Sequence, residues 1–346
     1  MVPFAHTAVL TNYLNVSQQL DLNTFSLLSS VGLCQSQLAD SKQRIPVDKA
    51  ITLLEASALS SGCEAFGLRM AELRQLSDFG EVSLLLSYQH TLRDALKIIS
   101  RYRNLLNDAL AIYVEESGHT AIIREEVVTP ASLYSRQATE LAVGTMHRLC
   151  ATLLQHKWRP TSAHFTHSAP KDLSIHRRVF GCTLEFGSEF NGLVCNASEL
   201  DQINPLANTA MADHAQRFLD ILQNDCEPSL ILDIRKSIYL LLPMGRATLD
   251  QVAHAHDINV RTLQRRLEAA QTSFSDLIND VRRNLVFRYL KNLNYSLSQV
   301  SDILGYSMPS SFTRWFINQF GVSPTVWREN NKVLIQQDIH LPQKTS

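Results

Sequence analysis

Two sets of polar residues in the C-terminal part of the chain have side-chain types that can read base pairs. Within each set, the residues are spaced at intervals that place them on one face of a helix. Arginine and glutamine are well shaped to hydrogen-bond purine edges in the major groove of DNA, and serine bonds to either base type. One such set alone would also fit a solvated helix face. The candidate DNA-contacting residues are Arg261, Thr262, Gln264 and Arg265 in the first set, and Ser310, Ser311 and Arg314 in the second.

The first set must be positioned by two helices joined by a tight turn. Thr248 begins the capping-box sequence of a helix, with Gln251 at the third position after it. After a short break, Asn259 caps a second helix, on which two leucines at helical spacing face inward. We therefore expect a helix-turn-helix unit over residues 248–270.

The second set is preceded by the same pattern. Ser296 caps a helix, Gly305 permits a turn, and Pro309 falls near the first turn of a helix carrying three phenylalanines. Gly321 then begins a stop signal, because glycine fits the left-handed residue after a helix. A second unit over residues 296–320 follows, and the duplication favours DNA contact over a merely solvated face.

A long amphipathic segment lies between the two units. Ser273 caps it, and apolar residues as far as Leu293 recur at helical spacing. Roughly twenty residues at about 1.5 Å each make a rod on the order of 30 Å. One turn of DNA is about 34 Å, so two helices held by this rod fit successive major grooves. The polar side of the rod is expected to carry Asp280, Arg282, Arg283, Arg288 and Lys291.

Five ordered motifs resemble the AraC/XylS family of bacterial transcription regulators over about the last hundred residues. The resemblance implies base contacts from the two sets above and a role as a DNA-binding regulator, more often an activator. Five positions depart from the family pattern: His256, Asp257, Gln271, Val286 and Ser301. Aspartate tolerates the left-handed region where the family has glycine, so the first turn should persist. The motifs are residues 262–267, 272–274, 303–307, 311–314 and 321–324.

Shorter motifs in the N-terminal part resemble the arabinose-binding-type sensor domain of the subgroup that includes ornithine-utilisation regulators. The similarity extends to about residue 200. It implies binding of an unknown small-molecule effector and dimerisation. The motifs are residues 46–48, 53–55, 66–69, 78–81, 101–102, 180–182 and 185–187.

Charge is divided unevenly along the chain. The formal net charge is −1, but residues 228–332 hold thirteen lysines and arginines against eight acidic residues, giving +5 and leaving −6 for the remainder. A basic module joined to an acidic one fits local attraction to phosphates. The sequence has no signal peptide and no apolar run of about eighteen residues, so we expect a cytoplasmic protein without membrane contact.

The patterns predict a mostly α protein with an α+β N-terminal sensor domain and an all-α C-terminal DNA-binding domain. We expect an effector-sensing and dimerisation domain over 1–223, a linker at 224–228, the DNA-binding domain over 229–332 and a tail over 333–346. The N-terminal elements should be a helical cluster from about 7 to 111, a hairpin at 112–114 and 120–123, strands near 162–166, 183–186 and 193–195, and helices near 132–156, 175–180 and 206–222. The DNA-binding domain should open with a helix over 231–242.

An enzyme is an alternative to a regulator, because a Cys/His pair can activate a nucleophile and several such residues lie between 164 and 182. The chain lacks nucleophile-elbow, zinc-protease and phosphate-loop motifs, so we expect no catalysis, cofactor or metal. His254 and His256, two positions apart on a helix, make a poor metal pair. The enzyme candidates are His164, His167, His176 and Cys182. The six cysteines, read as buried hydrophobes, are Cys34, Cys63, Cys150, Cys182, Cys195 and Cys226.

A second alternative is a ligand-binding or protein-interaction module that lacks specific DNA binding. The favoured interpretation is an effector-responsive DNA-binding regulator whose partners are operator DNA, RNA polymerase and a second copy of the chain. For the effector, arginines offer a fork suited to a carboxylate, but they also suit simple surface charge. Both readings stay open for Arg69, Arg101, Arg103 and Arg124.

Overall fold

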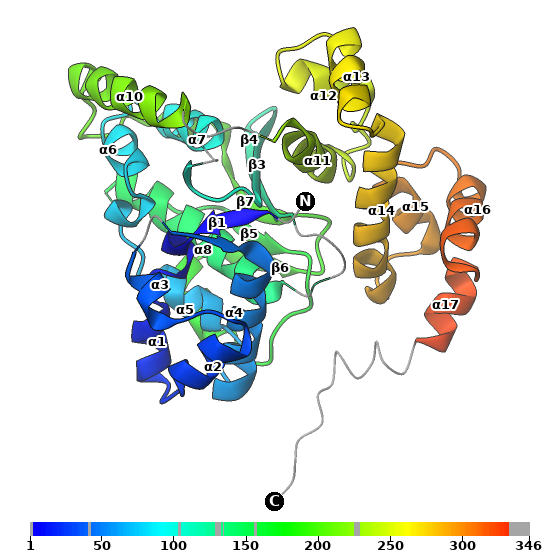
Figure 1. Ribbon diagram of the computed structural model, residues 1–346, viewed down its shortest axis with the longest axis horizontal. Coiled ribbons are helices and arrows are strands. Elements are labelled where there is room, and N and C mark those ends of the chain that lie inside the picture. The colour runs from blue at the N-terminus through cyan, green and yellow to red at the C-terminus, as the bar shows by residue number, and fades with distance from the viewer. Residues whose placement is uncertain are drawn as a thin grey trace, which may run out of the picture.

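The computed structural model describes residues 3–40, 43–102, 105–128, 133, 135–155, 158–224 and 229–331. Figure 1 shows a larger N-terminal part built around a sheet and a smaller helical C-terminal part beside it. Each part has its own cluster of buried apolar side chains. The tail at 333–346, Arg103 and residues 225–228 of the expected linker at 224–228 lie outside the described residues, while Asn224 ends a helix.

The first hundred residues form a cluster of short helices, as the periodicity predicts. One expectation was wrong: a two-stranded antiparallel sheet, β1 with β2, lies within this cluster. The first helical stretch of the cluster consists of two helices separated by Thr11 and Asn12. The elements are β1 (Phe4–His6), η1 (Thr7–Leu10), α1 (Tyr13–Gln19), α2 (Thr24–Ser30), α3 (Gln35–Ala39), β2 (Arg44–Pro46), α4 (Val47–Ser61), α5 (Phe66–Glu72), η2 (Leu76–Phe79), α6 (Val82–Ser87) and α7 (Leu92–Arg101).

A five-stranded sheet follows, in the order β3-β4-β7-β5-β6. The expected hairpin is β3 (Leu110–Ser117) with β4 (Thr120–Val127), and it is longer at both ends than the sequence indicated. The other strands are β5 (Ser162–Phe165), β6 (Thr183–Phe186) and β7 (Asn191–Asn196), with α9 (Ser174–Phe180) between β5 and β6. The sheet is antiparallel except for the parallel pair β5 and β6.

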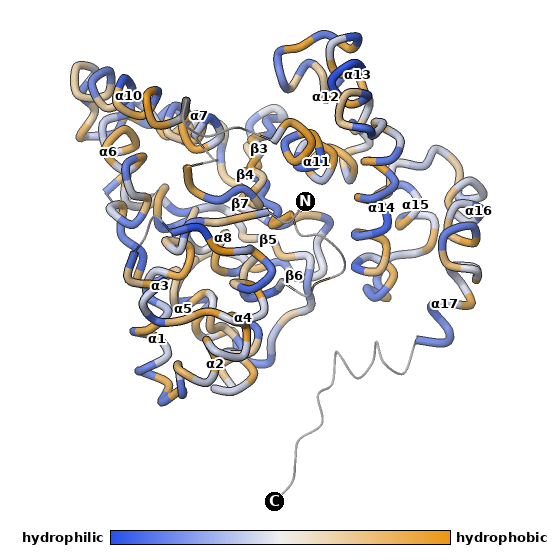
Figure 2. Tube along the Cα trace, in the orientation of Figure 1, coloured by the Kyte–Doolittle hydropathy of each residue, from blue (hydrophilic) through white to orange (hydrophobic). Residues whose placement is uncertain are grey.

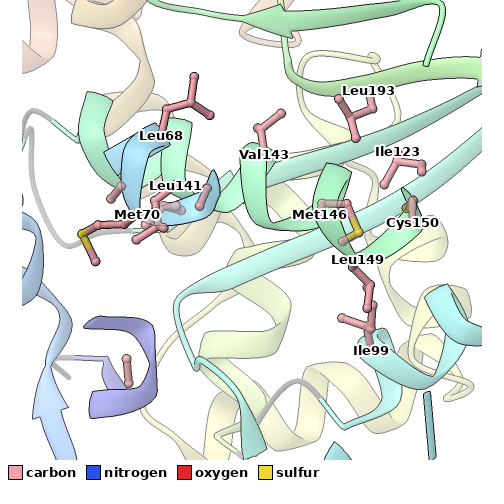
Figure 3. Close-up of a cluster of buried hydrophobic side chains, with 14 of the residues drawn as sticks. Leu68, Met70, Ile99, Ile123, Leu141, Val143, Met146, Leu149, Cys150 and Leu193 are labelled. Atoms are coloured by element: carbon pink, nitrogen blue, oxygen red, sulfur yellow. The ribbon is translucent and has the colours of Figure 1, made fainter. Parts of the chain in front are cut away.

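Helix α8 (Arg136–Leu153) joins the helical cluster to the sheet. Figure 3 shows Val143 and Cys150 of α8 near Ile123 and Leu193 of the sheet, while Leu149 points toward Ile99 of α7. Gly144 lets α5 approach closely, because a Cβ there would lie 2.6 Å from a Leu68 methyl carbon. The N-terminal part ends with η4 (Ala197–Asp201) and α10 (Thr209–Asn224).

The C-terminal part is all helical, as expected. Figure 2 shows hydrophilic and hydrophobic stretches alternating along α13, α14 and α16, which fits helices with one buried side. The helices are α11 (Leu230–Leu241), α12 (Leu249–Ala255), α13 (Val260–Ala269), α14 (Phe274–Lys291), α15 (Leu297–Ile303), α16 (Pro309–Phe320) and α17 (Pro324–Asn330).

Several local signals are confirmed at atomic level. Thr248, Asn259, Ser273 and Ser296 each accept a hydrogen bond from the backbone of the first turn of the helix that they cap. The predicted rod was too long, however. Helix α14 ends at Lys291, so Leu293 lies beyond it and is 40% exposed.

Candidate nucleic-acid interface

Helix α13 presents a continuous polar face. Leu263 and Leu267 are buried, which leaves Arg261, Gln264 and Arg265 exposed on the opposite side. Gln264 and Arg265 lie three and four positions after Arg261, about one helical turn away, so the three side chains form one surface. Thr262, the remaining candidate on this helix, is half-buried, and its N–H donates to the side chain of the cap Asn259.

Helix α16 presents a second polar face. Phe312 and Phe316 are buried, while Ser310 and Arg314 are exposed. Ser311 is half-buried, so it is less available than the sequence suggested. The sequence prediction omitted Thr313, which lines one shallow surface hollow with its neighbours, although helical spacing from Ser310 would have included it. The hollow is lined by Ser310, Thr313, Arg314, Ile317 and Asn318.

The arginines of the C-terminal part divide into two groups. The arginines of the first group make contacts within the protein: Arg282, Arg283 and Arg288 of α14, Arg328 of α17 and Arg235 of α11. Arg282 donates to the carbonyls of Leu304 and Gly305 and lies 4.0 Å above the Tyr306 ring, and burial lowers its pKa. The pairs of the others are Arg235 and Arg283 with Asp280, Arg288 with Glu126, and Arg328 with the carbonyls of Leu290 and Tyr295.

The second group remains available for an external anion or base. Among the described residues, Arg261, Arg265 and Arg314 make no ion pair or side-chain hydrogen bond; Arg266 of α13 and Arg246 in the loop before α12 share this property. The structure thus places unpaired guanidinium groups on α13 and α16 and paired ones on the helices that support them. This separation fits a binding surface carried on a rigid frame.

Helix α14 connects the two polar helices. Its 18 residues span about 27 Å at 1.5 Å per residue. Figure 1 places α12 and α13 beyond one end of α14, and α15 and α16 along its side toward the other end. The rod expected from the sequence is therefore present, though shorter.

Two positions of the first unit where the family usually has glycine carry other residues, yet they keep the left-handed backbone conformation. Asp257 and Gln271 adopt left-handed backbone angles, with φ of 52° and 55°. The left-handed conformation has a small conformational free-energy cost for aspartate and a cost of about 1 kcal/mol for glutamine. Gly305 and Gly321 occupy the corresponding region in the second unit at φ of 71° and 75°. Both expected turns are confirmed.

These two helix-turn-helix units are matched by comparisons with known proteins. Residues 252–330 match a helix-turn-helix domain model, and residues 22–204 match the model described as the arabinose-binding domain of AraC transcription regulator, N-terminal. The chain belongs to the AraC family. It is a DNA-binding transcription regulator with a sensor domain of the arabinose-binding type.

Relatives match this AraC-family chain over different shares of their length. The HTH-type transcriptional regulator VirS of Mycobacterium tuberculosis is 29% identical over 280 residues, which are 80% of this chain and 82% of that protein. The Ornithine utilization regulator of Pseudomonas aeruginosa is 23% identical over 270 residues, 78% of this chain and 79% of that protein. The HTH-type transcriptional activator CfaD of Escherichia coli is 32% identical over 77 residues, 22% of this chain and 29% of that protein.

The DNA-binding module of this AraC-family chain is docked on the sensor sheet. Ala111 of β3 and Val128 share one buried cluster with Ile234 and Ile238 of α11. Arg288 of α14 donates to Glu126 of β4 at 2.6 Å. Burial lowers the pKa of Arg288, and the Glu126 carboxylate more than offsets this, so the pKa lies above its ordinary value.

A second set of polar contacts joins α14 and the segment after it to the turn between β6 and β7. The Tyr295 hydroxyl and the Asn292 amide both donate to the Gly187 carbonyl, at 2.7 and 3.1 Å. Gly187 has φ of 68°, and a Cβ there would lie 3.0 Å from the Asn292 amide nitrogen. Tyr289 donates to the Glu189 carbonyl at 3.1 Å. The module therefore contacts the sensor at both edges of the sheet.

The residues considered for catalysis do not form one site. His167 and His176 both reach the buried Glu140, at 3.4 and 3.1 Å, and burial lowers the pKa of His167 to about 4. His164 instead contacts Ser162 and Ser188. Burial raises the pKa of Cys182 to about 11, which is opposite to what an activated thiol needs. Within the described residues no cluster of three or more His, Cys, Asp or Glu is arranged to hold a metal ion.

The arginines considered for the effector are occupied within the protein. Arg69 donates to Gln19, Arg101 pairs with Asp220, and Arg124 pairs with Glu115 while lying 4.3 Å from the Phe190 ring centre. None of these three lines the cavity of the sensor. In the part of the chain that the structure describes, no helix is both long and apolar enough to cross a membrane.

Proposed function

We propose that the polar faces of α13 and α16 bind one side of an operator, with α14 holding them about one helical turn of DNA apart. Base contacts come from Arg261, Thr262, Gln264 and Arg265 of α13, and from Ser310, Ser311 and Arg314 of α16. The observation that carries this proposal is the presence of unpaired, exposed arginines on these two helices, while those of α11, α14 and α17 are engaged in the fold. Helix α14, at about 27 Å, is shorter than one turn of DNA, at about 34 Å. Bending of the DNA makes up this difference in the proposal, at a cost on the order of 1 to 6 kcal/mol.

The proposed division of the chain is a sensor over 1–223, a linker at 224–228, a DNA-binding domain over 229–332 and a tail over 333–346. Effector binding changes how the module sits on the sensor, and this shifts the population able to bind DNA or contact RNA polymerase. The chain is proposed to activate transcription rather than repress it, and the name of the relative CfaD supports this. The proposal includes a cytoplasmic location and no catalytic role; the latter is supported by the raised pKa of the Cys182 thiol, which is opposite to what an activated nucleophile needs.

Genomic footprinting of the full-length chain tests the proposal. We expect protection of two neighbouring major grooves on one face of the DNA, about one helical turn apart, because α14 fixes the spacing of α13 and α16. Genes beside the protected sites will indicate the class of effector. Protection without preferred sequences, or of a single groove, would contradict the proposed double reader.

Dimerisation is proposed to use α10. Met211, Phe218 and Ile221 are 38%, 54% and 67% exposed, and they recur at seven- and three-residue intervals, which is the spacing of a coiled-coil seam. The adjacent side of α10 packs on α6, with Ala215 and Leu219 buried. Figure 1 places α10 at the edge of the molecule away from α16 and α17. A second copy of the same helix, related by a two-fold axis, supplies a self-complementary apolar partner.

Ile221→Glu is expected to raise the dimer dissociation constant at least about a hundredfold, because the substitution occurs on both protomers and each buried isoleucine contributes about 1.5 to 3 kcal/mol. Sedimentation velocity of the full chain over a range of concentrations measures this change. Leu59→Glu is the matched control, because Leu59 is 81% exposed on α4, away from the seam. A wild-type chain that sediments as a monomer, or an Ile221→Glu chain that dimerises normally, would refute the assignment to α10.

A further inference from the structure

The sensor encloses a cavity of about 560 Å³ between α4, α8, η1, η2, β3 and β4. Pockets of about 300 to 1,000 Å³ are typical for small-molecule ligands. Its wall is mostly aliphatic, with Ile51, Leu54, Leu141, Met146 and Leu149 contributing from α4 and α8. Figure 3 shows Leu141, Met146 and Leu149 along α8, with Ile99 opposite Leu149. The cavity therefore suits a ligand with an apolar body.

One carboxyl group interrupts this apolar wall. Glu125 of β4 lines the cavity and is 3% exposed. Among the described residues, no hydrogen bond or ion pair reaches either of its side-chain oxygens. Burial alone raises its pKa to about 8, so the group is mostly protonated near neutral pH. A buried carboxyl without a hydrogen-bond partner lowers the stability of the fold. Such a group is expected where a ligand supplies the missing partner.

A second polar group of the wall also lacks a partner. The Thr145 hydroxyl of α8 is buried, lines the cavity and makes no hydrogen bond among the described residues. Both the Thr145 hydroxyl and an ionised Glu125 accept hydrogen bonds. The unpartnered polar atoms of this wall are both Glu125 oxygens, the Thr145 hydroxyl oxygen and the Arg74 Nε, so three of the four can accept a hydrogen bond from a ligand.

The arginine of the wall is only partly satisfied by the protein, because the buried Arg74 Nε–H has no hydrogen-bond partner among the described residues. Arg74 donates to the carbonyls of Ala8 and Val9 at 2.7 and 2.6 Å. Burial lowers its pKa to about 10, and the nearby Asp78 acts in the opposite direction. The other ionisable residues of the wall are His6 and Glu81. Arg74 thus keeps one N–H without a partner, whereas Glu125 lacks a partner at both of its oxygens.

From these contacts we propose that the effector of this sensor is an organic amine, with an apolar body in the cavity and an ammonium group paired with the Glu125 carboxylate. An ammonium supplies up to three hydrogen-bond donors and the positive charge that Glu125 lacks. On binding, the protonated Glu125 gives its proton to solvent and the carboxylate pairs with the ammonium. The identification as effector rests on the proposed ligand-responsive function; the amine site itself does not.

The position of Glu125 also connects the cavity to the DNA-binding module. Successive residues of a strand point to opposite faces. Glu125 faces the cavity, and its neighbour Glu126 pairs with Arg288 of α14. A ligand that shifts β4 by its contact with Glu125 therefore moves the docking contact of the module.

Isothermal titration of the full chain with hexylamine, hexan-1-ol and hexanoate tests the proposed ligand class. We expect hexylamine to bind at least tenfold more tightly than either of the others. In two buffers of different ionisation enthalpy at pH 7, hexylamine binding should release close to one proton per chain. Equal affinities, preference for hexanoate, or binding without proton release would overturn the proposal.

Three variants sharpen this test. Glu125→Gln should remove both the amine preference and the proton release, whereas Glu185→Gln, at an exposed carboxyl of β6 that does not line the cavity, should retain both. Ala142→Phe fills the cavity and should weaken hexylamine and hexan-1-ol alike, which checks that binding occurs there. Amine preference that survives Glu125→Gln would place the ammonium elsewhere and refute the assignment.

Operator binding by the same preparations, measured with and without hexylamine, separates the two proposals. Amine binding with unchanged operator affinity would refute the effector role and leave the amine site intact. Failure of the wild-type chain to bind any operator would refute the proposed function while the titrations still decide the ligand class.

Discussion

Alanine at both Arg265 and Arg314 is expected to weaken binding to the specific operator by about 2 to 6 kcal/mol, a loss of roughly thirtyfold to more than ten-thousandfold. Each arginine contributes about 1 to 3 kcal/mol through contact with a base edge. The two contributions should add, because the side chains belong to separate helices that share no contacts. Each single substitution should relax base preference at one position of one half of the site, measured by competition among operator variants.

The salt dependence of affinity distinguishes base contacts from phosphate contacts. A lost phosphate contact weakens specific and random DNA equally and reduces the salt slope by about one. Arg177→Ala is the matched control, because Arg177 is exposed on α9 of the sensor, away from both the DNA-binding helices and α10. Equal losses on specific and random DNA in the Arg265→Ala and Arg314→Ala variants would reassign both residues to the DNA backbone.

The two helix-turn-helix units could be predicted because their signals are local. The caps Thr248 and Ser296, the stripes of buried leucine and phenylalanine, and the turn at Gly305 all act within one helix and its ends. The same reasoning missed β1 and β2, whose three-residue strands pair across a long separation in sequence and carry almost no periodicity.

Side-chain partners across the fold could not be predicted from periodicity. Helical spacing correctly placed Arg282 and Arg288 on the polar side of α14, but it did not show what lies opposite that side. Arg282 reaches the end of α15, and Arg288 reaches Glu126, which lies 162 positions away in sequence. The cavity was missed for the same reason. Glu125 is one of two successive glutamates near the end of a strand, and only the fold shows that both are buried and that Glu125 lines a cavity.

Glu126→Gln is expected to loosen the docking of the DNA-binding module by about 2 to 3 kcal/mol, because it leaves the Arg288 guanidinium without its carboxylate. Loss of a fully buried pair costs about 3 to 5 kcal/mol, and the smaller figure reflects the 26% exposure of the Arg288 side chain. The measurement is hydrogen exchange of the α11 backbone amides, whose protection should fall by roughly thirtyfold to a hundredfold. Arg288→Met should have a comparable effect.

Combining Glu126→Gln with Arg288→Met decides whether this pair acts as a unit. The double variant should be no less protected than either single variant, because the second substitution removes the charge that the first left unpaired. Arg283→Met is the matched control on the same helix, since Arg283 pairs with Asp280 inside the module and should leave protection of α11 unchanged. If the two losses simply add, Glu126 and Arg288 contribute independently. The docking of the module would then depend on the apolar contact of α11 with β3 and β4, and a ligand in the cavity would act on operator affinity through that contact.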